Sequence, residues 1–185
     1  MRVRRSVIQM GYVTTDLERS LDYWIDVVGA GPFYYAEYAP EEQVYRGRPT
    51  VTKFRLAYGY SGDMNIEVVQ QSDDAPSAYT ELLQTGRPVP IGGLFHHVMI
   101  DHDDYDATYQ HYLAAGAERC FDAMAPGGMR YSYLDARRQM DCYVELIEHA
   151  RDFAVALAKM REARLGWDGS RPRRDFSHHC HSCLG

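Results

Sequence analysis

The 185-residue sequence lacks an excess of positive charge, since its net charge is −6 at pH 7 and its isoelectric point is about 5.7. Nucleic-acid binding requires a concentrated basic surface, so we expect no nucleic-acid partner. No apolar run approaches the roughly 20 residues that a membrane-spanning helix needs. No apolar signal-peptide segment follows the basic residues near the N-terminus either. We therefore expect no membrane partner.

Cysteine is also scarce. Cys120 and Cys142 lie in the body of the chain, and Cys180 and Cys183 lie near its end. This sparse pattern does not indicate a disulfide framework, so we expect free thiols and a cytoplasmic protein. The histidine- and cysteine-containing end has no second half-site for a metal, and we expect residues 168–185 to form a disordered tail.

What the sequence does contain is an internal repeat at an offset of 88 residues. The segment 9–28 reads QMGYVTTDLERSLDYWIDVV, and the segment 97–115 reads HVMIDHDDYDATYQHYLAA. The offset aligns Gln9 with His97 and Asp16 with Asp104. Later in each copy, a short apolar run contains one glutamate, Glu67 or Glu145. An internal repeat constrains the architecture of the whole chain.

Each copy predicts the same order of elements, strand, helix, strand, strand, strand. In the first copy the strands are expected over 6–13, 33–38, 50–57 and 64–70, with a helix over 17–28. In the second copy the strands are expected over 97–101, 118–121, 129–134 and 142–148, with a helix over 105–115.

We therefore expect an α+β fold, in which two βαβββ modules pair into one cupped mixed β-sheet with helices on its outside. The predicted division is a first module over 1–72, a linker with a short helix over 73–93 and a second module over 94–149, followed by a C-terminal helix over 150–167.

Four polar residues occupy repeated positions on the first and last strands of the two copies, Gln9, Glu67, His97 and Glu145. Alternation along the strands would turn all four into the cup, with the apolar neighbours of each glutamate facing the helices. A buried carboxylate is costly unless something compensates its charge. Two carboxylates, an imidazole and an amide suit a divalent ion, and we expect Zn, Ni, Co, Mn or Fe(II). His96 should point to the opposite face by the same alternation.

With these residues the chain resembles the vicinal oxygen chelate superfamily, which contains glyoxalases, bleomycin-resistance proteins and extradiol dioxygenases. The motifs that carry the resemblance are QMGYVTTD, GAGPFY, NIEVVQ, GLFHHVMID and YVELIE, within about residues 6–149. The ligand set resembles that of glyoxalase I. The segments GPFY and LFHH resemble the methylmalonyl-CoA epimerase-like branch, although the strand expected over 50–57 lacks the acid of that branch.

The resemblance implies a metal-dependent lyase or isomerase that acts on a small substrate with two vicinal oxygens. It also implies that Glu145 or Glu67 leaves the ion and takes a proton next to a carbonyl. Two alternatives remain, an Fe(II)-dependent ring-cleaving dioxygenase and a non-catalytic small-molecule-binding protein of the bleomycin-resistance kind.

Further candidates for substrate binding are Tyr131 with Tyr133, which share one strand face, and Lys53 with Arg55, which share another. Either pair would line the pocket, and the basic pair would hold an anionic substrate. Phe33 is expected as a pocket wall or a core residue.

We also expect a homodimer that buries a sheet edge or the apolar side of the C-terminal helix. The sequence leaves open whether each site lies within one chain or between two.

Overall fold

The protein is described by a computed structural model that covers residues 5–125, 128–148 and 151–176. The first module consists of β1 (Arg5–Val13), α1 (Leu17–Asp22) with a π-helical turn η1 (Tyr23–Val27), β2 (Phe33–Tyr38), β5 (Phe54–Ser61) and β6 (Met64–Gln71). The second module consists of β7 (Leu94–His102), α3 (Tyr105–Ala114), β8 (Glu118–Ala125), β9 (Met129–Asp135) and β10 (Tyr143–Ile147). The other elements are β3 (Glu41–Tyr45), β4 (Arg48–Pro49), α2 (Ala78–Leu83), α4 (Arg137–Met140), α5 (Arg151–Leu165) and β11 (Arg173–Asp175).

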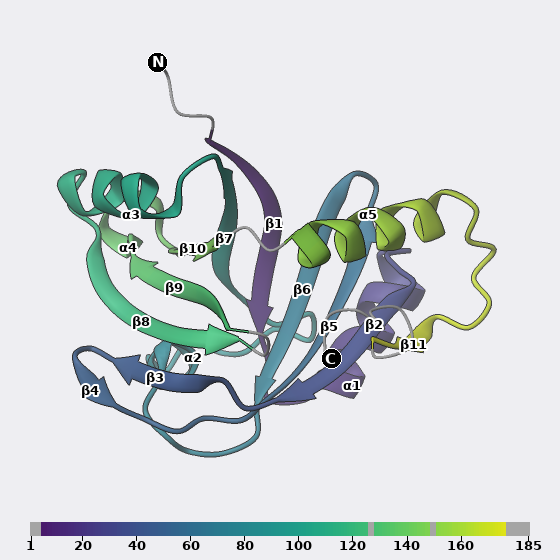
Figure 1. Ribbon diagram of the computed structural model, residues 1–185. Coiled ribbons are helices and arrows are strands. Elements are labelled where there is room, and N and C mark those ends of the chain that lie inside the picture. Colours follow the sequence, from purple (N-terminus) through teal and green to yellow (C-terminus); the bar gives the residue numbers. More distant parts are fainter. Residues whose placement is uncertain (1–4, 126–127, 149–150, 177–185) are drawn as a thin grey trace.

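The strands form one mixed sheet in the order β11-β2-β5-β6-β1-β7-β10-β9-β8-β3-β4 (Figure 1). The first strands of the two modules, β1 and β7, lie antiparallel at its centre. Each has the last strand of its own module as its parallel neighbour, β6 beside β1 and β10 beside β7. The predicted α+β fold of two paired βαβββ modules is therefore confirmed.

The repeat extends to the helix caps. Asp16 accepts a hydrogen bond from the Arg19 amide at the start of α1, and Asp104 accepts one from the Ala107 amide at the start of α3. A carboxylate at this position satisfies an amide that has no partner within the helix. Equivalent aspartates thus begin the equivalent helices of the two modules.

The two faces of the sheet have different coverings. On the outer face, α1 packs on the first module through Leu17 and Leu21, and Tyr109 of α3 packs on the second. On the inner face, the main core includes Tyr79 from α2 and Met160 from α5. The module helices α1 and α3 therefore lie outside as predicted, and the linker helix α2 and the C-terminal helix α5 pack on the inner face.

The described part of the chain beyond α5 contains one short strand. Strand β11 pairs in parallel with β2, and Arg173 forms ion pairs with Glu18 and Asp22. The prediction of a disordered tail is therefore wrong for residues 173–175, and residues 177–185 lie outside the described part. Within that part, no helix is long and apolar enough to cross a membrane.

Candidate metal centre

Four polar side chains converge at the middle of the sheet. Gln9, Glu67, His97 and Glu145 come from β1, β6, β7 and β10, the four central strands. All four are buried, with exposed fractions of 1, 3, 0 and 4% respectively. On both glutamate-bearing strands the apolar neighbours pack in the outer core, so each glutamate faces inward as alternation predicts.

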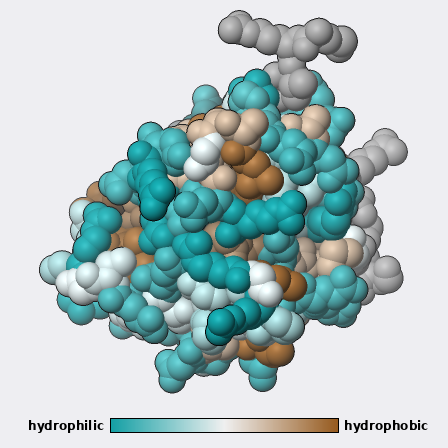
Figure 2. All heavy atoms as spheres, turned by 90° about the vertical axis from the view of Figure 1, so that its left-hand side faces the viewer, coloured by the Kyte–Doolittle hydropathy of each residue, from teal (hydrophilic) through white to brown (hydrophobic). Residues whose placement is uncertain are grey.

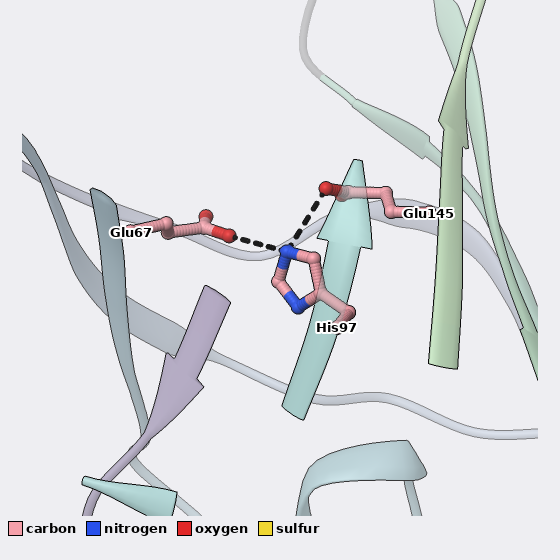
Figure 3. A group of neighbouring side chains, drawn as sticks. All are labelled: Glu67, His97 and Glu145. Atoms are coloured by element: carbon pink, nitrogen blue, oxygen red, sulfur yellow. Dashed lines mark ion pairs between the residues drawn. The ribbon is translucent and has the colours of Figure 1, made fainter. Parts of the chain in front are cut away.

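Nε2 of His97 is the common point of this cluster. It lies 3.0 Å from Oε2 of Glu67 and 3.1 Å from Oε2 of Glu145, which approach it from two sides (Figure 3). The Oε1 atom of Gln9 lies 3.3 Å from the same nitrogen. Repeated residues from the two modules therefore meet within one chain.

These donors fit a divalent ion. Oε2 of Glu67 and Oε2 of Glu145 are buried, and both have their short contact with the same nitrogen, Nε2 of His97, which can donate at most one proton. Ligands about 2.1 Å from an ion lie about 3.0 Å apart at adjacent corners of an octahedron and about 3.4 Å apart in a tetrahedron. The three distances from His97 fall in this interval. An ion would also compensate the charges of the two buried carboxylates, because a single proton on Nε2 of His97 cannot do so for both.

The carboxylates also control the protonation of His97. Burial alone would lower the pKa of His97, but Glu145 and Glu67 outweigh this effect and raise the pKa from 6.5 to about 9. The pKa of Glu67 is raised in turn, first by burial and then by the charge of Glu145. Without an ion, a proton on His97 therefore provides part of the positive charge that the cluster requires.

Gly11 makes room for the imidazole. It pairs with His97 between β1 and β7, and a Cβ atom at Gly11 would overlap the His97 ring. The sequence analysis did not identify this role of Gly11, because the close approach depends on the pairing of two strands that are distant in the sequence.

His96 does not follow the predicted alternation. Gly11 pairs with His97 and Tyr12 pairs with Phe95, so His96 is the extra residue of a β-bulge. The bulge places both histidines on the inner side, where Nδ1 of His96 lies 2.9 Å from Nδ1 of His97. The expectation that His96 faces the other way is therefore wrong.

The two predicted tyrosines lie close to the cluster. Tyr131 and Tyr133 are buried in the inner core, and the Tyr133 ring centre lies 5.0 Å from that of His97. The Tyr133 hydroxyl is 2.7 Å from the hydroxyl of Tyr79 on α2. Burial, reinforced by the two glutamates, raises the pKa of Tyr79 and Tyr133 well above 10, so both hydroxyls stay neutral.

The other predicted substrate residues lie away from the cluster. Phe33 packs in the outer core beneath α1. Lys53 is exposed, and Arg55 forms ion pairs with Glu18 and Glu37. The inner face of β5 instead carries Phe54, Leu56, Tyr58 and Tyr60, so the prediction that Lys53 and Arg55 line the pocket is wrong. Phe33 is a core residue, which was the second of its two predicted places.

One protein-family model matches residues 8–134 of this chain, that of the Glyoxalase/Bleomycin resistance protein/Dioxygenase superfamily. The match includes Gln9, Glu67 and His97 and ends before Glu145. Among curated proteins, no sequence matches the chain with significance.

Two solved structures have a similar fold. A hypothetical protein from Bacillus halodurans C-125 has a TM-score of 0.52 and 14% identity, over 79% of this chain and 95% of that one. Methylmalonyl-CoA epimerase from Mycobacterium tuberculosis has a TM-score of 0.50 and 14% identity, over 80% of this chain and 91% of that one. At this identity the likeness is one of fold.

Proposed function

The chain belongs to the Glyoxalase/Bleomycin resistance protein/Dioxygenase superfamily, and on that premise we propose that it is a metal-dependent lyase or isomerase of the glyoxalase type. Its reaction begins with removal of a proton from the carbon next to a carbonyl. The observation that carries this proposal is the buried group of Glu67, His97 and Glu145, with Gln9 beside it.

Gln9, Glu67, His97 and Glu145 would hold the ion. A divalent ion there would supply Lewis acidity to a carbonyl oxygen. The base has to come from the protein, and we assign it to Glu145 or Glu67, whose carboxylates face inward on either side of His97. The buried tyrosines around them would exclude water from the reacting carbon.

The charge of the inner face favours a neutral substrate. On β5, β6, β9 and β10, the described side chains that face inward near the glutamates include no lysine or arginine. These side chains include Phe54, Leu56, Tyr58, Tyr60, Asn65, Glu67, Val69, Tyr131, Tyr133, Tyr143, Glu145 and Ile147. A divalent ion balances the two carboxylates, and an anionic substrate would add a buried charge with no partner. We therefore propose a small neutral molecule with vicinal oxygens and an apolar body.

Two further points bear on the reaction class. Methylmalonyl-CoA epimerase has a similar fold, so this fold accommodates an isomerase reaction. A ring-cleaving dioxygenase uses two histidines and one carboxylate. The second histidine available here, His96, directs Nδ1 at His97 and not at the carboxylates. This arrangement favours proton transfer over ring cleavage.

The proposal is tested by hydrogen exchange, which does not require the natural product. The protein loaded with Zn²⁺, Ni²⁺ or Co²⁺ is mixed in D₂O with hydroxyacetone or 2-hydroxyacetophenone, and deuterium next to the carbonyl is followed by NMR. We expect metal-dependent exchange with these neutral ketones and much less with anionic hydroxypyruvate. Glu145→Gln or Glu67→Gln should abolish the exchange in whichever variant loses the base. Glu148→Gln, a control at a glutamate that pairs with Arg130, should retain it. The absence of exchange with every metal and ketone would contradict the proposed reaction.

A further inference from the structure

The two members of the cluster that are not carboxylates, Gln9 and His97, each contact one more buried polar residue. We propose that Asn65 and His96 are positioning residues, which determine the atom that Gln9 and His97 present to the ion. This inference rests on the proposed metal site and concerns two residues that are not themselves ligands. Asn65 and His96 are each only 1% exposed.

The orientation of the Gln9 amide follows from a chain of hydrogen bonds. Nδ2 of Asn65 donates to the backbone carbonyl of Gly59 at 3.0 Å. Because a carbonyl only accepts, the Asn65 amide must place its NH₂ group there and its oxygen toward Gln9. That oxygen accepts from Nε2 of Gln9 at 2.7 Å. The Gln9 oxygen is therefore turned toward His97 and the carboxylates, where a metal ligand is needed.

The orientation of the His97 proton follows from its contact with His96. An ion can bind Nε2 of His97 only if that nitrogen carries no proton, so the proton of a neutral ring must be on Nδ1. Nδ1 of His97 then donates to Nδ1 of His96, 2.9 Å away. This requires His96 to accept, with its own proton on Nε2. The opposite tautomer of His96 would place a proton on Nε2 of His97 and block the ion.

Two aromatic rings fix the orientation of the His96 imidazole. Its ring is stacked between Tyr79 of α2 and Tyr143 of β10, with ring centres 4.6 Å away on both sides. The guanidinium of Arg137 lies 4.8 Å from the Tyr143 ring centre. The β-bulge supplies the inward direction, and the stack fixes the plane of the ring.

The two modules orient their equivalent ligands, Gln9 and His97, through different neighbouring residues. The strand neighbour of Gln9 is Asn65, and the equivalent neighbour of His97 is Tyr143. Asn65 bonds its ligand directly, whereas Tyr143 stacks on His96, which the bulge inserts beside the ligand. In the metal-bound form, Gln9 and His97 therefore each have one buried acceptor for an N–H group.

The test measures Zn²⁺ affinity by competition with a chromogenic chelator. We compare the wild type with Asn65→Leu, which removes the acceptor, and with His96→Phe, which keeps the aromatic stack. Each should weaken Zn²⁺ binding by roughly 10- to 100-fold, the usual effect of removing a partner of a metal ligand. Each should also change the visible absorption of the Co²⁺-loaded protein. Thr108→Val on α3 should change neither, because it removes a buried hydroxyl that has no hydrogen-bond partner in the described residues and lies outside the site.

The outcomes separate this inference from the proposed function. A wild type that binds no divalent ion overturns the proposed function itself. A wild type that binds Zn²⁺, together with folded Asn65→Leu and His96→Phe variants of unchanged affinity and Co²⁺ spectrum, overturns only the positioning role.

If a variant does not fold, histidine ¹⁵N NMR of the Zn²⁺-loaded wild type decides the role of His96. We expect a proton on Nδ1 of His97 and on Nε2 of His96. A proton on Nδ1 of His96 would contradict the assignment.

Discussion

Single residues determine whether the site can form, and Gly11 does so by the absence of a side chain. We expect Gly11→Ala to displace the His97 ring, because the new Cβ atom would occupy its place. Overpacking of this kind costs about 1–3 kcal/mol in the free energy of unfolding, and metal affinity should fall as well. Urea unfolding and Zn²⁺ titration measure the two effects. Gly166→Ala is the matched control, because no atom lies within 4 Å of its added Cβ. Equal behaviour of the two variants would contradict the close packing at Gly11.

The proton on His97 predicts how metal affinity depends on pH. The folded pKa of about 9 lies above the usual 6.5, so protonation stabilises the metal-free protein fully below about pH 6.5, and this contribution is lost as pH rises through 9. An ion must displace this proton, so affinity should rise about tenfold per pH unit between pH 6.5 and 8.5. Calorimetry in buffers of different ionisation enthalpy should show release of about one proton. Binding that releases no proton would mean that His97 is not a ligand.

Sequence reasoning identified the four central residues because the repeat relates them in pairs. It placed Lys53 and Arg55 wrongly because a shift of one residue in strand register exchanges the two faces of a strand. Tyr58 pairs with Glu67, which places the aromatic residues of β5 inward and its basic residues outward. No local pattern indicates this register. The bulge at His96 likewise arises from the pairing of β7 with β1.

At the scale of elements, the sequence predicted those that both modules repeat, as well as the linker helix α2 and the C-terminal helix α5, and missed the shortest ones. Strand β2 was predicted with its observed bounds, and the helix over 17–28 continues after α1 as a π-helical turn. The short strands β3, β4 and β11 and helix α4 were missed, because each has fewer than six residues and no periodic pattern. Alternation and helical periodicity are readable only over longer segments.

Helix α5 provides a test of how the cup is filled. Met160 is 1% exposed in the inner core, so Met160→Ala should lower the free energy of unfolding by about 2–5 kcal/mol. Val155 lies on the same helix with 46% exposure, and Val155→Ala should change it by no more than about 0.5 kcal/mol. Thermal and urea unfolding compare the two. A similar small effect at both positions would show that α5 does not pack in the cup.

At the scale of the whole molecule, one chain brings together all four candidate ligands, so the site does not require exchange of modules between chains. The apolar side of α5, which we expected in a dimer interface, is covered by its own chain. The face that Figure 2 shows is mainly hydrophilic, with small separate hydrophobic areas. A dimer would therefore use another face or a sheet edge.

We still propose a homodimer, with an edge of the sheet in its interface. Sedimentation equilibrium at micromolar concentrations should give a mass of about twice the 21.2 kDa of the chain. A constant monomer mass over this range would contradict the dimer without affecting the metal site.

The central claim is that Gln9, Glu67, His97 and Glu145 bind one divalent ion. The most direct measurement is an anomalous diffraction map from crystals of the protein soaked in Zn²⁺ or Co²⁺. We expect one peak inside the cup, with a donor atom of each of the four residues about 2.0–2.3 Å away. A cup without a peak, or an ion that does not contact His97 and Glu145, would contradict the account.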